Sequence, residues 1–119
     1  MALLIKSGPR GASSAGLRPE MLVALQVADG LYREHGIDCV VTSGTEGKHR
    51  RGSLHYTGLA LDLRTWNLPA HVDVITVAAD LARNLGDDFD VVPEKIGQRG
   101  EHLHVEFHPD VSVNMRPKR

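Results

Sequence analysis

Two short segments alternate apolar and polar side chains, and this alternation constrains the fold more than any other feature. Residues 59–64, LALDLR, place leucines on one face of an extended chain and Asp62 on the other. Residues 102–107, HLHVEF, do the same and leave three polar side chains on one face: His102, His104 and Glu106. The pattern predicts two half-buried strands of a sheet that has one apolar and one polar face.

The rest of the chain predicts two helices and three further strand segments. Apolar residues recur every three or four positions from Pro19 to His35, and again from Pro69 to Leu85. The β-branched or short apolar runs at 37–43 and 89–93 predict buried strands, and a short strand precedes the Gly-, Pro- and Ser-rich loop at 7–16. We therefore expect an α+β domain with a mostly antiparallel sheet and helices packed on one face.

Composition limits the partners of the protein. The chain has 119 residues and a formal net charge of −1, which predicts one domain over 1–119 and gives no general field for nucleic acid or an anionic membrane. No apolar run is long enough for a membrane span, and the N-terminus lacks a signal-peptide pattern. We expect a soluble protein made in the cytoplasm, without nucleic-acid or membrane partners. The single cysteine, Cys39, is expected in the core.

Three side chains on the polar face predict a metal site. If the strands that carry Asp62 and His104 are neighbours, these side chains converge, and His55 can fold back onto them because Gly58 permits a turn. Two imidazoles and one carboxylate suit a catalytic zinc ion that keeps a fourth position open. Iron(II) remains an alternative on ligand type, as does a domain without metal whose histidines are incidental.

The spacing of these residues resembles that of a known family. Residues 53–62 spell S-x-H-x-x-G-x-A-x-D, and residues 101–104 spell E-x-x-H. Over about residues 37–107 the chain resembles zinc peptidases of the D-alanyl-D-alanine carboxypeptidase and dipeptidase type, which share the hedgehog/DD-peptidase fold with phage L-alanyl-D-glutamate endolysins. The resemblance implies that zinc is bound by His55, Asp62 and His104, with Glu101 as the catalytic base.

The resemblance also implies roles around the metal. Ser53 corresponds to a serine beside the substrate carboxylate, and His102 is expected to lie next to the ligands without binding the metal. The family's arginine before the serine motif is absent, so Lys48, Arg50 and Arg51 of the basic loop at 44–52 are our candidates to bind that carboxylate. Glu101 and His104 lie three residues apart and would face opposite ways on a regular strand, so a joint role requires an irregular chain near Gly100.

The activity implied by the resemblance is zinc-dependent hydrolysis of peptidoglycan stem peptides or of D-alanyl peptides. The short chain suits a phage lysis enzyme, which would reach the cell wall during lysis, or a cytoplasmic dipeptidase. The alternative of another class is a non-catalytic, zinc-bearing binding module of the same fold. Glu101 favours the enzyme, because a binding module has no need of a catalytic carboxylate.

Overall fold

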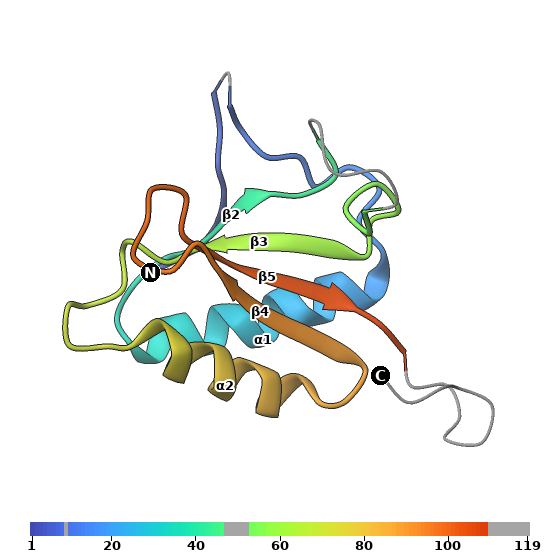
Figure 1. The fold of residues 1–119 in the computed structure, drawn as a ribbon. Coiled ribbons are helices and arrows are strands. Elements are labelled where there is room, and N and C mark those ends of the chain that lie inside the picture. Colours follow the sequence, from blue (N-terminus) through green and yellow to red (C-terminus); the bar gives the residue numbers. More distant parts are fainter. Residues whose placement is uncertain (9, 47–52, 110–119) are drawn as a thin grey trace.

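The protein is represented by a computed structural model, which describes residues 1–8, 10–46 and 53–109. These described residues form five strands and two helices, whose arrangement is seen in Figure 1. Their order is β1 (Leu3–Ile5), α1 (Pro19–Glu34), β2 (Cys39–Ser43), β3 (Ala60–Arg64), α2 (Val74–Leu85), β4 (Phe89–Glu94) and β5 (His102–Phe107). The α+β class predicted from the sequence is therefore confirmed.

The five strands form one mixed sheet in the order β1-β2-β3-β5-β4. β1 runs parallel to β2, and the other three pairings are antiparallel. Figure 1 shows both helices on the same side of this sheet, so its other side is left to the polar side chains. The sheet is thus mostly antiparallel with helices on one face, as expected.

The period-two pattern fixes which face each strand buries. Leu61 and Leu63 of β3, with Leu103 and Val105 of β5, are buried against α1 and α2. Cys39 of β2 belongs to the same core, as predicted, and burial raises the pKa of its thiol to about 12. The apolar face holds the strands in register, and the register in turn places the polar residues between them.

Helix α2 begins later than its sequence pattern predicts. Pro69 lies in a turn, where its carbonyl accepts a hydrogen bond from Val72, and the helix starts at Val74. The reason is the cap: the Asp73 carboxylate accepts a hydrogen bond from the backbone N–H of Ile75, a common way to satisfy the first turn of a helix. The other helix starts at Pro19 as predicted and ends at Glu34, one residue before His35.

Candidate metal centre

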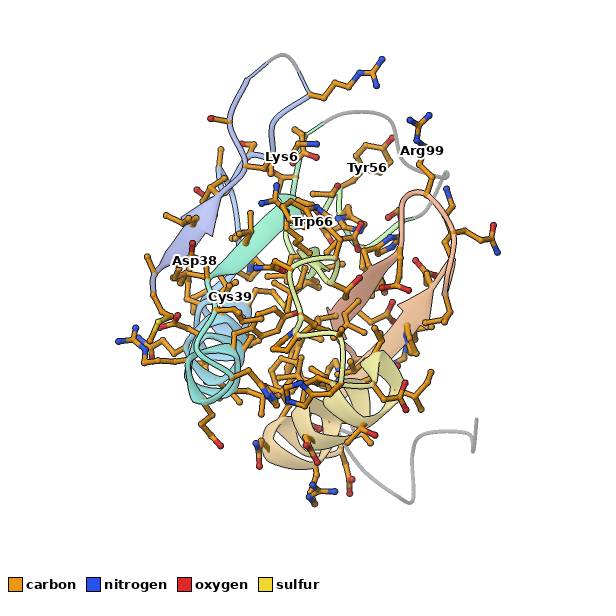
Figure 2. All side chains as sticks on the ribbon, turned by 90° about the vertical axis from the view of Figure 1, so that its left-hand side faces the viewer. Lys6, Asp38, Cys39, Tyr56, Trp66 and Arg99 are labelled. Carbon is orange, nitrogen blue, oxygen red and sulfur yellow. The ribbon has the colours of Figure 1, made fainter. Side chains whose placement is uncertain are left out.

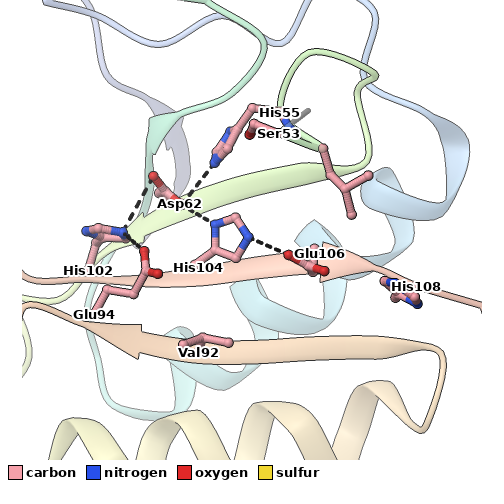
Figure 3. Close-up of a pocket in the computed structure, with 10 residues that line it drawn as sticks. Ser53, His55, Asp62, Val92, Glu94, His102, His104, Glu106 and His108 are labelled. Atoms are coloured by element: carbon pink, nitrogen blue, oxygen red, sulfur yellow. Dashed lines mark hydrogen bonds and ion pairs between the residues drawn. The ribbon is translucent and has the colours of Figure 1, made fainter. Parts of the chain in front are cut away.

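Two of the three predicted ligands are placed by strand pairing alone. Asp62 on β3 lies directly opposite His104 on β5, and both side chains point away from the helices. His104 Nδ1 lies 3.0 Å from Asp62 Oδ1 (Figure 3). Direct cross-strand neighbours on one face have Cβ atoms only about 5 Å apart, so this contact follows from the register.

The third ligand, His55, comes from a turn between β2 and β3. Its backbone N–H donates to Ser53 Oγ at 3.2 Å, and its Nε2 lies 3.4 Å from Asp62 Oδ1. The turn closes at Gly58, which has φ +75° and sits so close to the Gly16 carbonyl that a Cβ would approach its oxygen to 2.0 Å. Only glycine fits this position, so the predicted role of Gly58 in turning His55 back is confirmed.

The three side chains offer donor atoms that all lie within 4.8 Å of one another. His55 is buried with 4% of its surface exposed, and its Nδ1 is 2.8 Å from the Gly44 carbonyl oxygen. Because a carbonyl can only accept, Nδ1 carries the proton, and in the neutral ring Nε2 then presents a lone pair to the Asp62 carboxylate. Two electron-rich atoms facing each other are stabilised by a cation between them, so the donor set fits a metal ion.

The protonation of His104 and that of the carboxylates around it depend on one another. Both ring nitrogens of His104 face carboxylates, Nδ1 that of Asp62 and Nε2 that of Glu106 at 2.8 Å. Burial would lower the pKa of His104, but the hydrogen bonds with Asp62 and Glu106 outweigh it and raise that pKa to about 9. Burial would likewise raise the pKa of Asp62, but the hydrogen bond from His104 holds it well below its usual range. In the metal-free protein the ring of His104 is therefore protonated at neutral pH, and its positive charge offsets part of the negative charge of the carboxylates.

An outer layer of hydrogen bonds holds the Gly44 carbonyl in place. Glu46 Oε1 accepts hydrogen bonds from the backbone N–H groups of Ser13 at 2.7 Å and Gly44 at 2.6 Å, and its Oε2 accepts one from Ser43 Oγ at 2.9 Å. The Thr45 N–H, which shares a peptide group with the Gly44 carbonyl, donates to the Ser13 oxygen at 3.0 Å. A segment near the N-terminus thus orients the ring of His55 through one peptide group.

The three candidate ligands line a cavity of about 680 Å³, which we call the metal cavity. His102 lies on one side of it, with Nδ1 2.7 Å from the Gly100 carbonyl oxygen and Nε2 2.8 Å from Glu94 Oε1. Its Nε2 is also 3.7 Å from Asp62 Oδ2, so His102 stands beside the ligands and contacts one of them. Figure 3 shows Glu94 and His102 on one side of His104, and Glu106 on the other.

The side chain of Glu101 does not line the metal cavity. Its Oε1 accepts a hydrogen bond from Thr65 Oγ1 at 2.6 Å, and its Oε2 accepts one from the Gly97 N–H at 2.8 Å. These bonds lower the pKa of the carboxyl group, and the side chain lines a neighbouring cavity. The chain is irregular before β5, as a joint role with His104 requires, since Gly97 and Gly100 both adopt positive φ. Its assignment as catalytic base stays a prediction.

Of the other residues predicted for the site, one lies within the described part of the chain and three lie outside it. Ser53 lines the metal cavity, whereas Lys48, Arg50 and Arg51 lie outside the described residues. Two carboxylates that were given no role from the sequence line the cavity, Glu94 and Glu106. Glu106 had a signal, because it follows His104 by two positions on the polar face. Glu94 is carried by the neighbouring strand β4, opposite His102, and only strand pairing reveals it.

No family model matches the chain, and no significant match was found among curated proteins or solved structures. In the described part of the chain no helix is long and apolar enough to cross a membrane.

Proposed function

We propose that the protein is a zinc-dependent peptidase that hydrolyses peptide bonds of peptidoglycan stem peptides or of D-alanyl peptides. The observation that carries the proposal is the convergence of His55, Asp62 and His104 at the wall of an open cavity. Three protein ligands leave room for a fourth, which is the arrangement of catalytic rather than structural zinc. The spacing of these residues in the sequence, which resembles that of zinc peptidases, supports the substrate class.

Zinc bound at this place would polarise the scissile carbonyl and lower the pKa of water to about 7. The residues of the chain supply the rest. The Gly44 carbonyl holds His55 in the tautomer that presents Nε2, and Asp62 and His104 approach from paired strands. His102, tied to Glu94 and Gly100, lines the same cavity beside Asp62.

The proposed reaction needs a proton acceptor for the attacking water. Glu101 has that role in our proposal, and its carboxylate must then leave Thr65 and turn toward the cavity when substrate binds. Glu101 precedes His102 in the sequence, and His102 lines both cavities, so the two cavities adjoin beside Glu101. Glu94 already faces the metal cavity and is the competing candidate.

A second candidate function is a binding module that holds zinc without catalysis. One observation favours it: both oxygens of Glu101 are engaged by Thr65 and Gly97, away from the three ligands. A carboxylate fixed in this way would stabilise the turn before β5 and take no proton.

Hydrolysis assays distinguish the two functions. The full-length protein loaded with zinc is incubated with purified peptidoglycan and with short peptides that end in D-alanyl-D-alanine, and the products are identified by mass spectrometry. The proposal predicts new amino and carboxyl ends in at least one substrate, and their loss in Asp62→Ala. A protein that holds about one zinc per chain and releases no product from any substrate would be a binding module.

A further inference from the structure

A second cavity, of about 410 Å³, adjoins the metal cavity on the side of His102. Lys6 after β1, Arg64 at the end of β3 and Arg99 in the turn before β5 all line it. Figure 2 shows Lys6, Trp66 and Arg99 toward the same end of the molecule, although they come from segments far apart in the sequence. Three cationic side chains therefore meet beside the candidate metal centre.

These cations have no carboxylate partner among the described residues. Arg64 stacks its guanidinium over the ring of Trp66 at 4.5 Å, and its Nε is buried without a hydrogen-bond partner in the described chain. Glu101 is the one carboxylate among the residues that line the cavity, and its two oxygens already accept hydrogen bonds from Thr65 and Gly97. The described lining therefore carries an excess of positive charge, which an anionic ligand would balance.

The second cavity begins about two strand residues from Asp62. Arg64 follows Asp62 by two positions on β3 and is paired with His102, so the two side chains share the polar face. Two residues along a strand span about 7 Å, which is also about two residues of an extended peptide. A peptide with its scissile bond at the metal centre would bring a group one or two residues away to Arg64.

We propose that Lys6, Arg64 and Arg99 form a subsite for a carboxylate of a peptide substrate, one or two residues from the scissile bond. This inference rests on the proposed peptidase function and places anion recognition on the His102 side of the centre, in residues separate from the basic loop at 44–52. The guanidinium of Arg64, held over the ring of Trp66, offers N–H donors to the carboxylate. Trp66 is 73% exposed, so the stacked pair stands open to an incoming ligand.

Three peptides test the subsite. The probes are the stem peptide L-Ala-γ-D-Glu-L-Lys-D-Ala-D-Ala and two forms in which either the D-Glu α-carboxylate or the terminal carboxylate is an amide. Binding to the zinc-free, full-length protein is measured by calorimetry, and hydrolysis is measured with the zinc-loaded protein. Amidation of the carboxylate that occupies the subsite should weaken binding about 10- to 100-fold, as expected for a hydrogen-bonded charge. Whichever of the two amidated peptides binds more weakly shows which carboxylate occupies the subsite.

Arg64→Gln should remove this preference, so that it binds the acid and the amide alike, while its zinc content stays at the parental value. Lys6→Gln and Arg99→Gln should reduce the preference and keep the test valid if Arg64→Gln folds poorly. Arg83→Gln is the matched control, because Arg83 lies on α2 and pairs with Asp80 far from the sheet's polar face. It should bind all three peptides like the parent.

The outcomes separate this inference from the proposed function. Equal binding and hydrolysis of all three peptides by the parent would overturn the subsite and leave the peptidase standing. A carboxylate preference that depends on Arg64, in a protein that hydrolyses none of the peptides, would support the subsite and overturn the peptidase. Selectivity lost in Arg50→Gln or Arg51→Gln but kept in Arg64→Gln would assign the carboxylate to the basic loop instead.

Discussion

The candidate centre has two halves that differ in what holds them. Asp62 and His104 stand opposite each other on regular strands, and the buried leucines on the reverse face fix their register. His55 and Glu101 are carried by turns, and their directions depend on hydrogen bonds to Gly44 and to Thr65. The half on the strands is held by the packed sheet, whereas the half on the turns depends on contacts with residues far away in the sequence.

This difference indicates where the centre can be changed. A variant that alters a hydrogen bond behind a turn should weaken the site and leave the fold intact, because the sheet does not depend on that bond. A variant on the strands should act on the metal directly.

The carboxylate that accepts the proton should show the largest effect. Glu101→Gln should lower kcat by about 100- to 10,000-fold, because it keeps the shape and loses the basicity of the side chain. Zinc content and Tm should stay close to those of the parent. Glu94→Gln, measured in parallel, should retain most of the activity. If instead Glu94→Gln loses the activity and Glu101→Gln keeps it, the proton acceptor comes from β4.

Zinc affinity should rise steeply with pH. Zinc must displace the proton of His104, whose pKa is raised to about 9, so apparent affinity should increase about tenfold per pH unit well below 9, and about 50-fold from pH 7 to 9. The same proton stabilises the zinc-free fold fully below pH 6.5, and this stabilisation is lost as the pH rises through about 9.

Chelator competition and thermal unfolding of the zinc-free protein measure the two effects. Glu106→Gln is the control, because it removes one of the two charges that raise the pKa of His104 and should flatten both profiles. Affinity that is constant over this range would contradict the coupling.

The outer layer behind His55 should have a smaller effect. Glu46→Ala removes the acceptor of the Ser13 and Gly44 N–H groups, and loss of such support usually lowers metal affinity about 10- to 100-fold. Glu46→Gln keeps an oxygen for both and should restore the affinity. Ser43→Ala removes one bond to the same carboxylate and should change little. If Glu46→Ala binds zinc like the parent, the turn holds His55 without this support.

The same two halves explain how much the sequence predicts. Alternation in 59–64 and 102–107 predicts both the buried leucines and the neighbouring Asp62 and His104, because period and face are local properties. The turn at Gly58 is predicted as well. The position of the Glu101 side chain is not predicted by the sequence. Its hydrogen-bond partner Thr65 is 36 residues away, and no local sequence pattern indicates this bond. The pairing of β4 with β5, which brings Glu94 to His102, is also long-range.

The basic cavity shows the same limit. Lys6, Arg64 and Arg99 are scattered along the chain, and only the sheet order and the turn before β5 gather them at one end of the metal cavity. In the sequence the charges that draw attention are those of the basic loop at 44–52, because they are adjacent. Residues that act together need not be close in the sequence.

Zinc content is the most direct measure of whether His55, Asp62 and His104 form a metal site. The protein is purified without added metal, and its zinc is measured by elemental analysis, alongside His55→Ala, Asp62→Ala and His104→Ala. We predict about one zinc per chain for the parent and a clear loss in each variant, because each removes one of the three candidate ligands found among the described residues. Full retention of zinc in all three variants, or a parent that binds none when zinc is supplied, would contradict the account.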